Sequence, residues 1–234
     1  MSSRRPSPSL SAQELTITWQ SVSLLLDYPD DELLARADLL RSLSLRLPTT
    51  IGDSIRDFIV QLESTPLSEL QADYVETFDN RRRCNLFLTY FAHGDTRKRG
   101  MALLRFKQTY LRAGFTLDDA ELPDHLCVVL EFAATGDHDL GRGLMLDHRA
   151  GLELLRLSLR DLGSRWTVLL DAVSATLPTL RGDERDAVRR LAAVGPPEEE
   201  VGLAPFANPT FSPGARSAGE TLLLPMPSFP GVRA

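Results

Sequence analysis

The stretch RRRCNLFLTYFAHGDTRKRGMALLRFKQTYLRAGF (residues 81–115) places two arginine-rich runs beside a dense apolar and aromatic segment. Its apolar spacing predicts two helices. The first contains Leu86, Phe87, Tyr90 and Phe91, and the second starts near Asp95, contains Met101, Leu104 and Leu111, and stops at Gly114. Some of these residues would suit each of four kinds of site: a nucleic-acid-binding surface, a membrane helix, a metal site or the wall of a protein-binding groove. The remainder of the chain has to distinguish these classes.

The same helical spacing continues on both sides of this stretch. Ser11 and Glu14 fit a capping box, and Thr65 and Pro66 suit the cap and first position of a further helix. Asp183 can cap a last helix that runs to Gly195. Apolar stripes predict the other helices over residues 15–26, a segment restarting after Pro29, and residues 55–62, 67–78, 126–133, 152–162 and 166–177.

No alternating strand pattern is evident, and the glycine-rich DHDLGRG (residues 137–143) reads as a turn between helices. We therefore expect an all-α fold, a single multi-helix bundle-like domain over residues 11–195. Residues 1–10 are expected to form a disordered tail. Residues 196–234 hold about half of the 15 prolines and are expected to form a Pro/Gly-rich, partly disordered tail, although TLLLPMPSF within it is apolar enough to dock.

Composition excludes several functions. With a formal net charge of -6, the 234-residue chain lacks the basic face that a general nucleic-acid binder needs. The apolar runs are too short to cross a bilayer, so we expect no integral membrane segment. The arginines Arg4 and Arg5 precede prolines and serines rather than the hydrophobic run of an export signal. Cys84 and Cys127 form no CxxC pair, so the simplest expectation is a reduced cytoplasmic protein without a thiolate metal site.

The histidines leave a catalytic alternative open. His125, His138 and His148 each neighbour an aspartate, and carboxylate with imidazole can bind a transition metal. The chain nevertheless has neither the Glu-x-x-His pairs of a carboxylate metal centre nor the His-Glu-x-x-His of a zinc protease. It also lacks a phosphate-binding glycine loop and a serine elbow. A protein that is not an enzyme is favoured, with a metal-dependent hydrolase as a rival.

ELPDHL (residues 121–126) is the most distinctive short motif. Pro123 suits the opening turn of a helix, and Asp124 complements the positive end of that helix. His125 would be a hydrogen-bonding or proton-sensitive group near the same end. The residues alone are compatible with plain helix initiation or with a functional site.

Four blocks in order carry a resemblance to a known family. They are YVETFD, FLTYFAHGDTRKRGMALLRFKQTYLRAGF, ELPDHL with the following VVLEFAA, and GPPEEEVGLAPF. The chain resembles the NarJ-type nitrate reductase assembly chaperones within the TorD-like group of redox-enzyme maturation proteins. The resemblance runs from about residue 24 to residue 206 and is densest over residues 74–134.

The resemblance implies an all-helical TorD-like chaperone of the cytoplasm. Such a protein binds the N-terminal segment of the catalytic (alpha) subunit of a membrane-bound respiratory nitrate reductase. It keeps that subunit competent for insertion of the bis-guanine-dinucleotide molybdenum cofactor (bis-MGD) before membrane attachment. No stably bound cofactor of its own is implied, and proteins of molybdenum cofactor biosynthesis are further partners that the resemblance allows.

An amphipathic helix with basic residues is a good ligand for an apolar groove rimmed by carboxylates. We expect the groove to involve His125 and the 97–99 RKR run to face solvent. The candidates for floor and walls are Tyr74, Phe78, Leu86, Phe87, Tyr90 and Leu126, and those for the rim are Glu76, Asp79, Asp124 and Glu131. A general helical protein-protein adaptor is the alternative to the chaperone.

Overall fold

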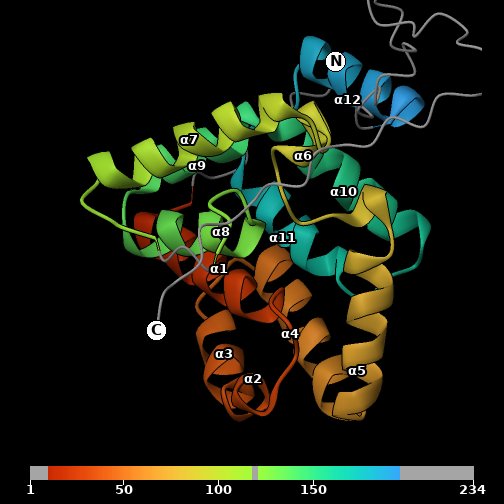
Figure 1. Cartoon of the computed structure of the whole chain (residues 1–234). Coiled ribbons are helices and arrows are strands. Elements are labelled where there is room, and N and C mark those ends of the chain that lie inside the picture. Colours follow the sequence, from red (N-terminus) through yellow and green to blue (C-terminus); the bar gives the residue numbers. More distant parts are fainter. Residues whose placement is uncertain (1–9, 118–120, 196–234) are drawn as a thin grey trace, which may run out of the picture. The chain divides into compact units, whose positions relative to one another are not determined.

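A computed structural model describes residues 10–117 and 121–195, and all of them belong to one compact unit. Within these residues every regular element is a helix and no strand occurs, which confirms the all-α prediction (Figure 1). The tails predicted over residues 1–10 and 196–234 lie outside the described residues, except for Leu10. No helix among those described is both long enough and apolar enough to span a membrane.

The first half of the chain contains α1 (Ala12–Leu25), α2 (Asp31–Ala35), α3 (Ala37–Ser44), α4 (Thr49–Ser64) and α5 (Leu67–Tyr74). A π-helical turn, η1 (Val75–Asp79), extends α5, and a 3-10 turn, η2 (Arg82–Cys84), follows. The second half contains α6 (Tyr90–His93), α7 (Arg97–Arg112), α8 (Leu126–Thr135), α9 (His138–Asp147), α10 (Arg149–Asp161), α11 (Thr167–Thr176) and α12 (Gly182–Val194).

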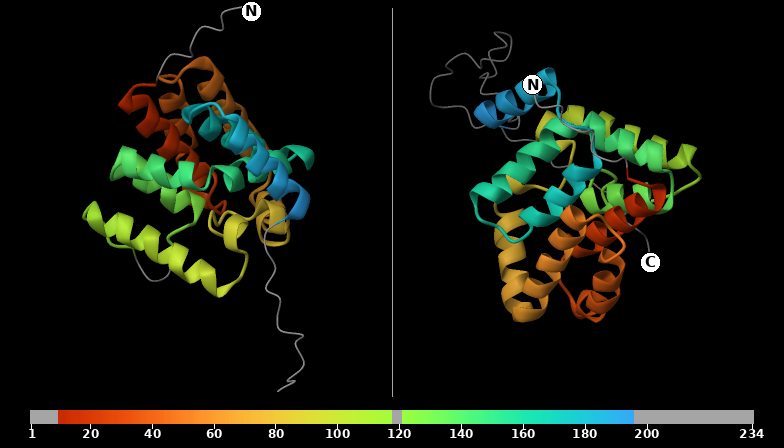
Figure 2. Two further views of the ribbon diagram at one scale, coloured as in Figure 1. Left: turned by 90° about the horizontal axis from the view of Figure 1, so that it is seen from above. Right: turned by 180° about the vertical axis from the view of Figure 1, so that it is seen from behind.

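Helix α1 packs against α8, α11 and α4, and α4 also packs against α11 (Figures 1 and 2). Trp19 and Val22 are fully buried there, as the predicted apolar stripe requires. The Trp19 indole N–H donates to the Thr176 hydroxyl across 3.0 Å, so the first helix is fixed to the end of α11. The core therefore joins residues more than 150 positions apart.

The three helix starts for which the sequence predicts a cap agree with the structure to within two residues. The predicted capping box is present, since the Ser11 hydroxyl accepts from the Glu14 N–H and the Glu14 carboxylate accepts from the Ser11 N–H. Pro66 lies at the cap of α5 rather than at its first position, and Arg181 rather than Asp183 is the cap of α12. Differences of this size are normal at helix ends.

Three predicted features are wrong. DHDLGRG is not a turn, because its residues form the start of α9, where Gly141 packs directly on Ala133 of α8. Leu86 and Phe87 are not helical, because α6 begins only at Tyr90. The predicted stripe of α7 faces outward, since Met101, Leu104 and Leu111 are exposed while Ala102, Phe106, Thr109 and Tyr110 are buried. The helix is apolar on both faces, so spacing alone could not select the inner one.

The contact between α8 and α9 yields a first prediction. A Cβ on Gly141 would lie 2.5 Å from the Ala133 Cα, so Gly141→Ala must push the two helices apart. We expect it to lower the free energy of unfolding by about 1 to 3 kcal/mol, measured by urea denaturation.

Gly143 is the matched control on the same helix. A Cβ there meets nothing within 4 Å, so Gly143→Ala should stabilise by about 0.5 to 1 kcal/mol through helix propensity. Equal effects of the two substitutions would contradict the close packing.

Candidate functional site

ELPDHL and the segment after η2 pair with each other through their backbones. The Leu126 N–H donates to the Leu86 carbonyl across 2.9 Å, and the Leu88 N–H donates to the Asp124 carbonyl across 3.0 Å. Phe87 and His125 face each other in the resulting isolated antiparallel bridge. This pairing uses backbone groups that a helix through Leu86 would need, which is the physical reason why that predicted helix does not form.

The Asp124 side chain is fully buried and connects three segments. Its Oδ2 accepts from the Thr89 N–H at 3.1 Å and from the Thr89 hydroxyl. The Arg99 guanidinium lies 3.6 Å from the same oxygen. Asp124 is therefore a structural acceptor inside the fold, and the structure does not bring its carboxylate to a solvent-facing rim.

His125 and Phe87 lie together at the surface of this junction, both partly buried. Their ring centroids are 5.1 Å apart, and the Arg99 guanidinium lies 5.3 Å from the centre of the Phe87 ring. Burial is the main reason why the pKa of His125 is lowered, so the ring is held neutral. Arg97 and Lys98 are exposed as expected, but Arg99 of the same run packs inward.

Tyr74 and Phe78 belong to an aromatic cluster in the core. Their ring centroids are 4.7 Å apart, and Trp166 lies within 5.7 Å of Tyr74 and 5.3 Å of Phe78. Both side chains are more than nine-tenths buried, and the same holds for the candidates Leu86, Tyr90 and Leu126. These residues can shape a binding surface from below, but little of their own area is open to a ligand.

The end of α1 lies between the two groups of candidates. The Tyr74 hydroxyl donates to the Leu26 carbonyl, and the Ser23 hydroxyl donates to the carbonyl of Cys127, two residues after His125. The negative charge of Asp27 acts on both Tyr74 and His125. The structure thus brings the region of residues 74–79 and the region of residues 87 and 125 to the same end of α1.

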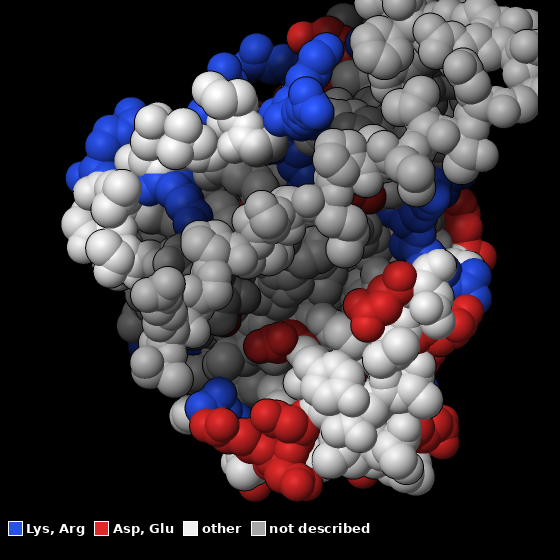
Figure 3. Space-filling model, viewed as in Figure 1, with Lys and Arg blue, Asp and Glu red and all other residues white. Residues whose placement is uncertain are grey.

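Exposed side chains around Tyr74 form the surface at this place, which we name the α1-end surface. It consists of Asp27, Tyr28, Val75, Glu76 and Asp79. The Tyr28 ring is 46% exposed and stands edge-on to Tyr74, with 5.5 Å between centroids. Figure 3 shows carboxylates on this side of the molecule, whereas basic side chains gather over α7. An exposed aromatic among carboxylates can bind a basic amphipathic segment.

Sequence reasoning missed Asp27 and Tyr28. The available signal was DYP (residues 27–29), in which an aromatic residue beside an acid stands at the point where a helix must stop before proline. The candidate Glu131 lies apart from the other candidates. It borders a separate cavity of about 230 Å³ with Tyr110, Phe115 and Phe132.

None of the described residues forms a cluster of three or more histidine, cysteine or carboxylate side chains that could hold a metal ion. Both cysteines are buried, and burial raises the pKa of Cys84 to about 11 and that of Cys127 well above its ordinary value.

The fold matches a solved structure, described as a redox enzyme maturation protein from Archaeoglobus fulgidus. The TM-score is 0.50 at 21% identity, and the match covers 73% of this chain and 96% of that one. This likeness concerns the fold alone, and it defines this chain as an all-helical protein of the same fold.

Sequence comparison gives the family. Residues 45–171 match the model of the nitrate reductase delta subunit. The chain is 32% identical over 165 residues to the "Probable nitrate reductase molybdenum cofactor assembly chaperone NarJ" of Bacillus subtilis, covering 70% of this chain and 90% of that protein. It is 35% identical over 160 residues to the "Nitrate reductase-like protein NarX" of Mycobacterium tuberculosis, 68% of this chain but only 24% of that longer protein. The chain belongs to the nitrate reductase delta subunit family, which is a family of assembly chaperones and not of enzymes.

The burial of Asp124 yields a second prediction. Asp124→Ala leaves the Thr89 N–H without its acceptor and removes the buried carboxylate beside the Arg99 guanidinium, which keeps its ion pair with Asp95. We expect it to lower the free energy of unfolding by about 3 kcal/mol. Glu131→Ala, at an exposed carboxylate of α8, is the control and should change stability by less than about 0.5 kcal/mol. Equal denaturation midpoints for the two variants would show that the Asp124 contacts do not stabilise the fold.

The neutral histidines yield a third prediction. Burial lowers the pKa of His125 and of His148 from the ordinary 6.5, so the unfolded chain binds more protons than the folded chain below that value. The contribution to stability is complete above 6.5 and is lost as the pH falls through the lowered values. We expect His125→Gln to make the fall in unfolding free energy between about pH 7 and pH 5 shallower. An unchanged slope would mean that His125 titrates normally in the folded state.

Proposed function

We propose that this chain is the chaperone of the catalytic subunit of a respiratory nitrate reductase. It binds the N-terminal segment of that subunit and keeps the subunit competent for insertion of the molybdenum cofactor before membrane attachment. Membership of the nitrate reductase delta subunit family supports this proposal, as do relatives named as nitrate reductase molybdenum cofactor assembly chaperones. The cofactor is cargo for the client, and the chaperone works in the cytoplasm, where the client is assembled.

The observation that carries the binding site is the partly exposed Tyr28 ring on the α1-end surface. Tyr28 is supported from below by Tyr74, which is itself fixed to the Leu26 carbonyl. Asp27 precedes it in the chain, and Glu76 and Asp79 follow Tyr74. A rigid aromatic ring beside carboxylates suits the apolar face and the basic flank of one client helix.

Glu76 illustrates how the carboxylate side of this surface is kept charged. Its oxygens accept from the Asn80 amide at 3.0 Å and from the Arg81 guanidinium at 2.7 Å. These contacts, the Asn80 hydrogen bond first, lower the pKa of Glu76. Because Glu76 already has a basic neighbour, Asp27 and Asp79 are the stronger candidates for pairing with a basic client residue.

Apolar contact should supply most of the affinity. A client segment that folds on binding loses about 2 to 5 kcal/mol of the gross interaction energy to ordering. Exposed ion pairs are worth only about 0 to 1 kcal/mol each and are screened by salt. The buried candidates Tyr74 and Phe78 would then act by holding Tyr28 and the α5–η1 backbone in place.

The fourth prediction tests this surface by calorimetry with a synthetic peptide from the N-terminus of the cognate catalytic subunit. Tyr28→Ala should weaken binding by about 2 kcal/mol, because it removes the central aromatic contact. The double variant Asp27→Asn with Asp79→Asn should cost less and should reduce the salt dependence of binding.

Leu45→Ala is the control, since this side chain is 70% exposed and lies outside the α1-end surface. It should leave the affinity unchanged, and circular dichroism should show the same helix content in every variant. The peptide should gain helix on binding. Normal affinity of the Tyr28→Ala protein would place the peptide on another surface.

A general helical adaptor remains the alternative function. It predicts comparable affinity for amphipathic peptides of unrelated origin, whereas a dedicated chaperone discriminates. A scrambled client peptide of the same composition separates the two functions in the same calorimetric experiment.

A further inference from the structure

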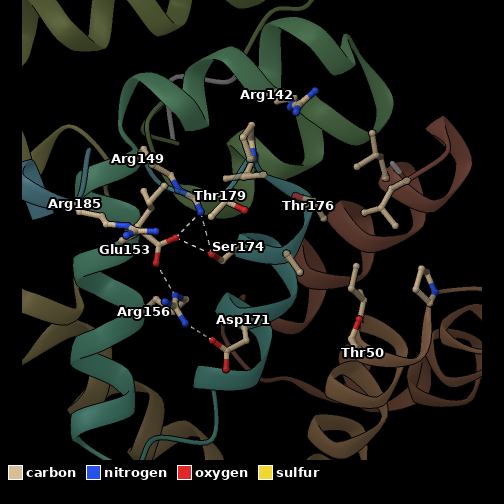
Figure 4. A pocket seen from close by; sticks show the side chains of 18 residues that line it. Thr50, Arg142, Arg149, Glu153, Arg156, Asp171, Ser174, Thr176, Thr179 and Arg185 are labelled. Atoms are coloured by element: carbon tan, nitrogen blue, oxygen red, sulfur yellow. Dashed lines mark hydrogen bonds and ion pairs between the residues drawn. The ribbon is translucent and has the colours of Figure 1, made fainter. Parts of the chain in front are cut away.

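A second feature of the fold, separate from the α1-end surface, is an arginine-lined cavity of about 940 Å³ (Figure 4). It lies among the starts of α1, α4 and α12 and the facing sides of α10 and α11. Four lining residues are basic and two are acidic: Arg142, Arg149, Arg156 and Arg185 against Glu153 and Asp171. The lining therefore carries two more positive than negative groups in a chain whose net charge is -6.

Both acids of the cavity already have partners. Glu153 is almost fully buried, and its Oε1 accepts from the Arg149 guanidinium and from the Ser174 hydroxyl, each at 2.7 Å. Its Oε2 accepts from Arg156 at 2.7 Å. Asp171 accepts from Arg156 and from Arg160, also at 2.7 Å. Neither carboxylate is left to neutralise the other arginines of the wall.

Arg149 has unsatisfied hydrogen-bond donors. The residue is only 5% exposed, and its Nε and Nη1 have no hydrogen-bond partner among the described residues. Arg142, which is half-buried, has the same deficit at its Nε, whereas Arg185 is exposed. No ion pair joins Arg142 or Arg185 to a described acid. Buried polar groups normally find a partner, and a buried charge without one is costly.

The opposite wall of the cavity adds a helix N-terminus. Pro48, Thr50 and Ile51 line the cavity where the 16-residue helix α4 begins. No side chain caps this end, and its first turn contains no acidic residue. The Ile51 and Gly52 N–H groups donate to the Pro48 carbonyl, so the N–H groups of Thr49 and Thr50 and the positive end of the helix dipole remain available for an anion.

We propose that this cavity binds a small molecule through a phosphate group, and that Arg142, Arg185 and the N-terminus of α4, which line different sides of the cavity (Figure 4), supply the positive field around it. Phosphate oxygens accept from several directions and match the planar donor fork of arginine. Arg149 is a positioning residue, because its ion pair with Glu153 fixes the wall of the cavity. Thr50 and Thr179 add hydroxyl donors to the lining. The proposal does not depend on the client peptide, so each can fail without the other.

The test is calorimetric titration of the full chain with inorganic pyrophosphate, against sodium chloride of equal ionic strength. We expect saturable binding, weakened about tenfold or more by Arg142→Gln combined with Arg185→Gln. Arg189→Gln is the matched control, because Arg189 is an exposed residue of the same helix as Arg185 but does not line the cavity. Its affinity should stay within about twofold of the unchanged protein.

A thermal melt gives an independent readout, because a ligand that binds only the folded state raises Tm. Pyrophosphate should raise the Tm of the unchanged protein and of Arg189→Gln, but not that of the double variant. Three results would overturn the proposal: no saturable binding, an equal loss in Arg189→Gln, or succinate binding as tightly as pyrophosphate. The last result would identify a carboxylate site instead.

Discussion

The buried Asp124 carboxylate holds together the part of the fold on which the candidate surface depends. It accepts from Thr89 before α6, lies beside Arg99 of α7, and stands two residues before α8. A buried charge without such partners would be expensive, so the three segments are obliged to meet. The backbone hydrogen bonds of Leu86 and Leu88 to the ELPDHL motif fix which residues of the two segments lie opposite each other.

This junction is connected to the α1-end surface through α1 itself. Helix α1 packs on α8, and the Ser23 hydroxyl donates to the carbonyl of Cys127, the second residue of α8. Three residues further on, the Leu26 carbonyl accepts from Tyr74, which supports the exposed Tyr28. The exposed residues that we propose for client binding thus rest on a chain of buried hydrogen bonds and aromatic contacts, which makes the surface rigid before any client arrives.

The molecule separates its charges in a way that suits two different tasks. Carboxylates accompany the exposed aromatic at the end of α1, whereas the cavity between α4, α10 and α12 is lined by arginines in excess of acids. The first surface suits a basic, amphipathic polypeptide segment. The second suits a compact anion, because its arginines outnumber its acids and the buried Nε and Nη1 donors of Arg149 lack a hydrogen-bond partner.

The sequence by itself determined the all-α class, the family and the principal helices, because helical periodicity and capping act over a few neighbouring residues. Only the tertiary structure decided which apolar stripe of α7 faces inward, since Met101 and Phe106 are both apolar and the choice depends on what α7 packs against. The tertiary structure also decided which candidate site residues are exposed and which are buried. Asp124 looks the same in sequence as an exposed first-turn acid, and only its burial against Thr89 and Arg99 makes it a structural residue. Tyr28 shows the opposite case. The sequence does not reveal that its ring is exposed, because only the packing of distant segments leaves that ring at the surface, where a client could contact it.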